Sequence, residues 1–253
     1  MDNLVYILFI CIVAPLALMA LMLRNRSRLL VGYMLIGIFV SLFVSELNTI
    51  LLGLFGGDAL YVSTTITPIS EEIVKALPIL FYAIVFSDDR DRVLPIAFAT
   101  GVGFAMFENI VILVQNVEAV TVGWAVIRGF ATALMHAVCT VMVGYGICFV
   151  KKKKKLFVSG IFALLALAMI YHGIFNMLVQ SDYQYFGFFL PGVTYIPILI
   201  LHFRYYKRKK VNGTSRNLDL RWRTHPNVTT QVCACLCRAR WMDYFSAGVC
   251  QLL

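Results

Sequence analysis

Three ionisable residues lie within five positions of one another in an otherwise apolar segment: Glu71, Glu72 and Lys75. A charged side chain inside a bilayer is expensive, so membrane segments retain one mainly where it has a partner and a function. Later apolar segments carry further polar groups, namely Glu108 with Asn109, His136, and His172 with Asn176. Carboxylates and imidazoles are the side chains that most often transfer protons in catalysis. Their gathering here predicts a reaction site within the membrane.

The spacing of these residues supports shared helix faces. Three pairs are four residues apart and therefore lie on one face of a helix: Glu71 with Lys75, Phe104 with Glu108, and His172 with Asn176. Structural roles are the alternative, either as a buried ion pair that fixes helix register or as interhelical hydrogen bonds. Ionisable residues in a membrane segment are functional by default, which favours chemistry.

Composition places the chain in the membrane. Of its 253 residues 60% are hydrophobic, 14% are charged, and the mean hydropathy is +0.83. Soluble domains carry about 25% charged residues. The net charge of +9 comes from short basic clusters between apolar segments, which is a signal of membrane topology. It requires no nucleic-acid partner.

A membrane span needs about 20 apolar residues. The sequence predicts an all-α bundle of about seven spans, at roughly 4–23, 29–52, 61–86, 93–115, 126–150, 156–179 and 186–206. Basic and non-basic loops alternate, so the positive-inside rule predicts an outer N-terminus and a cytoplasmic C-terminus. In that topology the polar groups of four helices share a depth of roughly 12–15 Å below the outer surface.

In order along the chain, these motifs resemble those of the PrsW family of intramembrane proteases. The matching residues are Glu71-Glu72-x-x-Lys75, Phe104-x-x-x-Glu108-Asn109, His136, and His172-x-x-x-Asn176. The family belongs to a superfamily with the CAAX prenyl proteases and bacteriocin-processing membrane proteins. The resemblance covers roughly residues 1–207. It implies cleavage of a membrane-anchored protein near the outer face, such as an anti-sigma-factor-like substrate, in a bacterial plasma membrane.

The resemblance also implies roles for single residues. Glu71, the first acid of the pair with Glu72, would be the general base, and His172 with Asn176 would stabilise the oxyanion. Glu108 stands where the CAAX relatives have a histidine that helps to hold the water, a role that His136 could take. Lys75, Phe104 and Asn109 would support the site.

The same side chains suit a metal. Glu71, Glu108, His136 and His172 offer two carboxylates and two imidazoles, a donor set that zinc accepts. The sequence has no HExxH motif. The ammonium group of Lys75 can offset the charge of the acids, so a metal ion is not required for that purpose. The expectation from sequence is therefore a glutamate-type protease, with zinc as the close alternative. A proton- or solute-coupled transporter that uses the same groups as a relay is the competing function.

The last part of the chain, residues 208–253, is mixed polar and contains Cys233, Cys235 and Cys237. A zinc site would need a second pair of ligands at suitable spacing, and none is convincing. We expect a cytoplasmic tail, disordered or non-native, beside a protease domain at 1–207.

Overall fold

The structure is a computed structural model that describes residues 2–116, 118, 121–149, 154–197, 199–200, 203–204 and 207. The chain divides into two units, Met1–Pro197 and Ile198–Leu253. The predicted tail, 208–253, lies outside the described residues, and so do its cysteines. Throughout the described part the secondary structure is helical, which confirms the predicted all-α class.

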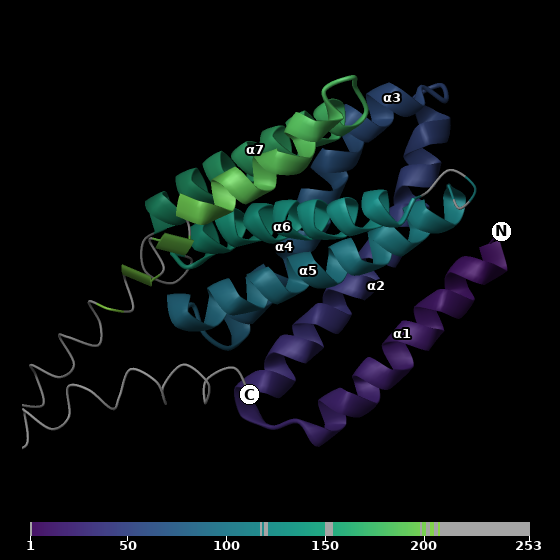
Figure 1. Cartoon of the computed structure of the whole chain (residues 1–253). Coiled ribbons are helices and arrows are strands. Elements are labelled where there is room, and N and C mark those ends of the chain that lie inside the picture. The colour runs from purple at the N-terminus through teal and green to yellow at the C-terminus, as the bar shows by residue number, and fades with distance from the viewer. Residues whose placement is uncertain are drawn as a thin grey trace, which may run out of the picture. The chain divides into compact units, whose positions relative to one another are not determined.

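The helices of the first unit follow one another with short connections (Figure 1). They are α1 (Asp2–Met22), α2 (Asn25–Leu54), α3 (Ala59–Tyr61), the π-helix η1 (Val62–Ile66), α4 (Thr67–Val85), α5 (Arg90–Gln115), α6 (Val122–Ile147) and α7 (Lys154–Val179). A further helical segment follows at 184–197. The predicted span at 61–86 is therefore one helical rod with a π-helical turn near its start.

Four helical segments in the described residues are long and apolar enough to cross a membrane: Asn25–Leu54, Arg90–Gln115, Val122–Ile147 and Val158–Val179. The helix α4 is as long as a span but is interrupted by Glu71, Glu72 and Lys75. Its charges are tolerable because α4 contacts α2, α5, α6 and α7, which surround it. The protein is therefore a multi-pass membrane protein, while its seven-span topology stays a prediction.

Small residues let these helices approach closely, as is usual between membrane helices. A side chain at Gly37 of α2 would collide with the carbonyl oxygen of Thr100 in α5, and one at Gly103 of α5 would collide with that of Met34. A side chain at Gly101 would lie 2.6 Å from the carbonyl oxygen of His136 in α6. Helix α5 is thus held between α2 and α6 (Figure 1).

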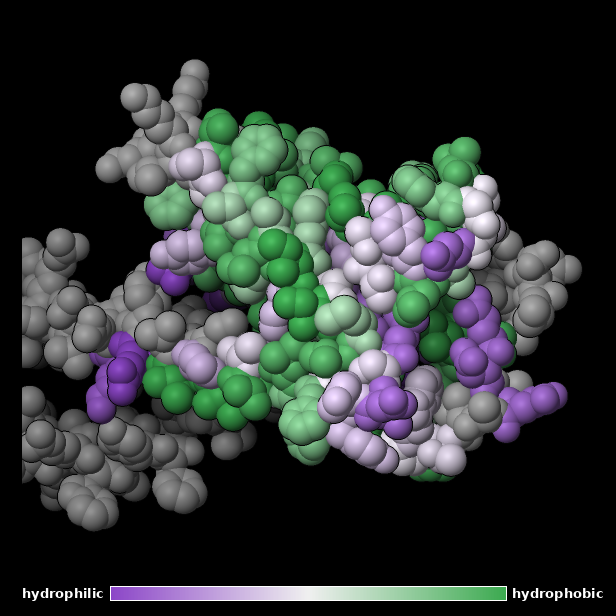
Figure 2. Space-filling model, turned by 90° about the horizontal axis from the view of Figure 1, so that it is seen from above, coloured by the Kyte–Doolittle hydropathy of each residue, from purple (hydrophilic) through white to green (hydrophobic). Residues whose placement is uncertain are grey.

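The outward surface is apolar. Phe39, Phe130 and Phe162 are more than half exposed, and hydrophobic side chains cover much of the face seen in Figure 2. Such a surface is suited to lipid, whereas the charged residues of α4 are among the most deeply buried side chains. The fold therefore encloses the charged residues of α4 and exposes many apolar side chains.

Candidate metal and catalytic site

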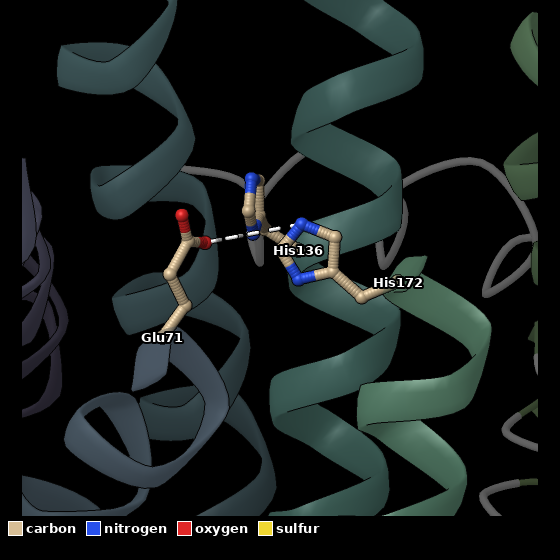
Figure 3. A group of neighbouring side chains, drawn as sticks. All are labelled: Glu71, His136 and His172. Atoms are coloured by element: carbon tan, nitrogen blue, oxygen red, sulfur yellow. Dashed lines mark ion pairs between the residues drawn. The ribbon is translucent and has the colours of Figure 1, made fainter. Parts of the chain in front are cut away.

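Three side chains from three helices meet in the interior of the bundle. Glu71 of α4, His136 of α6 and His172 of α7 each offer a ligand atom, and these atoms lie within 4.8 Å of one another (Figure 3). Glu71 Oε2 is 3.9 Å from His136 Nδ1 and 3.9 Å from His172 Nε2. All three residues are buried. The sequence could place them at one depth, and the structure brings them together.

Each imidazole is oriented by a second carboxylate. Because an ionised carboxylate only accepts hydrogen bonds, His136 Nε2–H donates to Glu108 Oε2 at 2.7 Å. For the same reason His172 Nδ1–H donates to Glu72 Oε1 at 2.9 Å. The nitrogens that keep a lone pair are therefore Nδ1 of His136 and Nε2 of His172, and each lies 3.9 Å from Glu71 Oε2. A carboxylate that fixes the tautomer and the orientation of a ligating histidine is a common feature of metal sites.

Lys75 lies beneath this group and is fully buried. Its Nζ donates to Glu72 Oε1 at 2.6 Å and to His136 Nδ1 at 2.8 Å, and it lies 3.7 Å from Glu71 Oε2. The ammonium also sits 4.5 Å from the centre of the Phe104 ring. The lysine thus neutralises the acid pair, and in this arrangement it occupies the lone pair of His136.

Three rings of the site pack against one another in tilted and edge-to-face contacts. The centroid of His136 lies 4.9 Å from that of Phe104 and 4.9 Å from that of His172. These contacts and the bonds to Glu108 and Glu72 restrict rotation of the two imidazole rings. Phe104, expected as a supporting residue, therefore forms part of the wall of the site.

The π-helical turn η1 has a local cause in Pro68. The amide of Thr67 donates to the carbonyl of Val62, five residues back, and the next residue is a proline without an N–H. The carbonyl oxygen of Ser63 is therefore left without a helical donor. Asn176 of α7 fills the gap, because its Nδ2 donates to Ser63 O at 2.9 Å. Single π-helical turns often occur at functional sites.

This bond commits part of Asn176 to the backbone. The family resemblance implied that Asn176 and His172 are oxyanion donors. In the structure one N–H of Asn176 is donated to Ser63 O, and Nδ1–H of His172 is donated to Glu72. Gly173 lies between them in sequence, and a Cβ there would approach the carbonyl oxygen of Thr64 to 2.8 Å. The arrangement positions His172 by docking α7 on the π-helical turn.

A cavity of about 600 Å³ leads to Glu71. Its wall includes Glu71, Glu108, Phe104 and Asn176, and it extends to Gln115 and Asn116 at the end of α5 and to Gln180 just beyond α7. Its volume is within the usual range for a ligand site. The carboxylates can therefore be reached from the end of the bundle that carries Gln115 and Gln180, which the sequence predicts to be the outer end.

Some residues on this wall were missed by sequence reasoning. Ser41, Ser45, Asn48 and Thr49 of α2 line the cavity, and their spacing would have placed them on one helix face. Arg128 of α6 also lines it. Asn109, expected as a support, is not on the wall, and its Oδ1 has no hydrogen-bond partner among the described residues.

The donor atoms fit a metal ion. Glu71 Oε2 and His172 Nε2 are buried and have no hydrogen-bond partner in the described structure. Two electron-rich atoms that face each other across 3.9 Å call for a proton, a water or a cation between them. One carboxylate and two imidazoles match a catalytic zinc site with three protein ligands. The group Glu71–His136–His172 could therefore hold a metal.

Comparison with known proteins supports this assignment. A family model described as PrsW family intramembrane metalloprotease matches residues 25–202, more than two thirds of the 253 residues. The matched range contains every residue of the site. No curated protein and no solved structure shows significant similarity to the chain.

Proposed function

Since the chain belongs to the PrsW family of intramembrane metalloproteases, and is thus a membrane-embedded peptidase, we propose that it hydrolyses a peptide bond at Glu71, His136 and His172. Membership confirms the resemblance seen in the four motifs. It also decides between the peptidase and the transporter that the sequence left as an alternative. The observation that carries the proposed site is the unpartnered pair, Glu71 Oε2 and His172 Nε2, facing each other across 3.9 Å.

Glu71, His136 and His172 would hold the metal, for which zinc is the ion that the donor set favours. When bound, such an ion acts as a Lewis acid towards the scissile carbonyl group. This proposal reverses the preference for a glutamate-type mechanism, because the family description and the gathered donors both favour the metal. In the reversed assignment Glu71 is a ligand rather than the general base.

The role of general base then passes to Glu108. Its side chain is 21% exposed, the most accessible of the three acids in the cluster, and it lies on the cavity wall. One of its oxygens accepts the Nε2–H of His136, and the carboxylate remains open towards the cavity. A base must lie within hydrogen-bond reach of the proton that it removes, and a substrate in the cavity would bring that proton to Glu108.

Glu72 and Lys75 have positioning roles in this proposal. Glu72 holds the Nδ1–H of His172, so that Nε2 keeps its lone pair towards Glu71. Lys75 offsets the charge of the two acids and contacts His136. Binding of the metal would require the hydrogen bond from Lys75 to His136 Nδ1 to break. The single lone pair of that nitrogen cannot accept a hydrogen bond and bind a metal ion at the same time.

The substrate class follows from the burial of the site. A membrane-anchored protein can enter a bundle from the bilayer, and the cavity opens at the end that the topology assigns to the outer face. Cleavage would then occur near the outer face of a bacterial plasma membrane, on an anti-sigma-factor-like or similar anchored protein. Partners are thus the substrate and the lipid bilayer.

A comparison of cells that express the wild-type protein with cells that express Glu71→Gln tests the proposal. Quantitative mass spectrometry of new protein N-termini should reveal membrane proteins cut only in the wild type. Glu46→Gln, an exposed acid on α2, provides a matched control and should retain cleavage. If the two strains have identical sets of cut membrane proteins, the proposed function is wrong.

A further inference from the structure

Arg128 is a buried cation that the proposed chemistry leaves unused. Its residue is 9% exposed, although it lies within the long apolar helix α6. Its Nε is buried and has no hydrogen-bond partner among the described residues. The guanidinium lies against the ring of Trp124, with 5.4 Å from its central carbon to the ring centroid.

The charge of Arg128 acts on that of Glu108, but no described acid hydrogen-bonds the guanidinium. A buried guanidinium without a hydrogen-bonded anion requires an explanation, because buried charges are normally both paired and hydrogen-bonded. The nearest acid on the same wall, Glu108, is engaged with His136. The other cavity acid, Glu71, lies among the histidines. Apart from these two acids, Arg128 is the only charged residue on the described cavity wall, and the rest are apolar or uncharged polar residues.

We infer that Arg128 binds a carboxylate of the substrate peptide, and that it makes the protease selective for an acidic group close to the scissile bond. The inference rests on the proposed function. Arginine is well suited to this role, since its planar group donates two parallel hydrogen bonds to a carboxylate. The Trp124 ring supports the guanidinium from one side and leaves its N–H groups for the ligand.

The helix gives an approximate distance between the carboxylate and the reaction site. Arg128 precedes His136 by eight residues on α6, which corresponds to about 12 Å along the helix axis. An extended peptide advances about 3.3 Å per residue. The acidic group should therefore lie within about five residues of the cleaved bond. A side-chain carboxylate of Asp or Glu and a free C-terminal carboxylate would both satisfy the chemistry.

A randomised peptide library, prepared with free and with amidated C-termini, can test the inference on the full chain in zwitterionic lipid nanodiscs. Mass spectrometry of the products gives the residue preference around each cut. The wild type should prefer Asp or Glu by about tenfold to hundredfold at one position, the usual effect of a hydrogen bond to a charged group. Preference that persists in the amidated library identifies a side-chain carboxylate, and preference restricted to free termini identifies the terminal carboxylate.

Variants of Arg128 distinguish recognition from a structural role. Arg128→Gln should lose the acidic preference, Arg128→Lys should retain part of it, and Arg128→Glu should prefer Lys or Arg instead. Arg92→Gln, which removes an exposed arginine of α5, should leave the preference unchanged. Flat preference in the wild type, or an acidic preference that survives in Arg128→Glu, overturns the inference. So does an Arg128-dependent stimulation by anionic lipid with no peptide preference, because the bound anion is then a lipid phosphate.

A binding measurement separates this inference from the proposed function. Glu71→Gln protein, immobilised in nanodiscs, should retain acidic peptides of the library over their amide counterparts, and Glu71→Gln/Arg128→Gln should not. If acidic peptides are retained while the wild type cuts nothing, the proposed function fails and the carboxylate site stands. If the wild type cuts peptides in a Glu71-dependent way and neither protein distinguishes acids from amides, the carboxylate site fails alone.

Discussion

At the scale of single residues, the site is an alternation of acids and imidazoles around one lysine. Glu71 faces two histidines, and each histidine is held from behind by another acid, Glu72 or Glu108. In the proposed site Glu71 is a ligand, Glu72 a positioning residue and Glu108 the base. The sequence alone did not separate these roles. A ligand and a base can be distinguished experimentally, because loss of a ligand removes the metal and loss of the base lowers only the rate.

Glu71→Gln and Glu108→Gln should therefore differ in their metal content. Glu71→Gln should lose bound zinc and cleavage, because an amide is a poor ligand for the ion. Glu108→Gln should retain zinc and still lose about 10²–10⁴-fold in rate, the usual contribution of a general base. Metal analysis and cleavage rates of the purified variants check this. Equal zinc contents in both variants would contradict the separation of roles.

Lys75→Met should destabilise the metal-free protein by about 3–5 kcal/mol, the usual effect of removing one partner of a buried ion pair. Glu72 would be left uncompensated in the interior. Zinc should restore much of the loss, because the ion supplies positive charge at the same place. Thermal unfolding in detergent, with and without zinc, measures both effects, and Arg92→Met provides an exposed control. A variant as stable as the wild type without zinc would rule out this role for Lys75.

At the scale of helices, the π-helical turn η1 before α4 is the feature that connects α4 to α7. Pro68 cannot supply the N–H that Ser63 O needs, and Asn176 supplies one from α7. The turn thereby joins the helix that carries Glu71 to the helix that carries His172. Gly173 allows the two backbones to approach at that point.

Asn176→Ala should lower the stability by about 1–3 kcal/mol, because the partly buried carbonyl of Ser63 loses its donor. Pro68→Ala returns a backbone N–H to the helix, so the double variant Pro68→Ala/Asn176→Ala should recover part of that loss. Chemical denaturation of the four proteins of this double-mutant cycle gives the coupling free energy. Strictly additive effects of the two changes would show that the proline and the asparagine act independently.

Sequence alone could predict the polar residues of the site because charged and imidazole groups are conspicuous in apolar segments. Helices such as α5 and α6 were predictable because their sequences are long apolar runs. The pairings were not predictable, because partners such as His136 and Glu108 are joined only by the packing of different helices. The bond from Asn176 to a main-chain carbonyl and the burial of Arg128 depend equally on tertiary structure.

At the scale of the whole molecule, the helices form a polar cavity inside an apolar exterior. Basic residues such as Arg26 and Arg90 lie at one end, where Arg26 Nη2 donates to the carbonyl of Asp91 at 3.1 Å. The cavity reaches the other end, at Gln115 and Gln180. The positive-inside rule then predicts that the cavity opens at the outer face.

Reporter fusions test that orientation. A fusion after Lys155 should be active only as a cytoplasmic reporter, and a fusion after Ser181 only as an external one, because α7 crosses between them. Accessibility of single cysteines introduced at Gln115 to a membrane-impermeant reagent gives an independent check. The opposite pattern would place the cavity mouth in the cytoplasm and exclude cleavage at the outer face.

The central claim, a metal held by Glu71, His136 and His172 in a working peptidase, is tested most directly by a chelator titration of cleavage. The purified full chain, in lipid nanodiscs with the amidated peptide library, is depleted of metal and then supplied with zinc. We expect cleavage to fall to background on depletion and to return at about one zinc per chain, whereas Glu71→Gln stays inactive throughout. Full cleavage by the metal-free protein, still abolished by Glu71→Gln, would contradict the metal site and establish a glutamate protease instead.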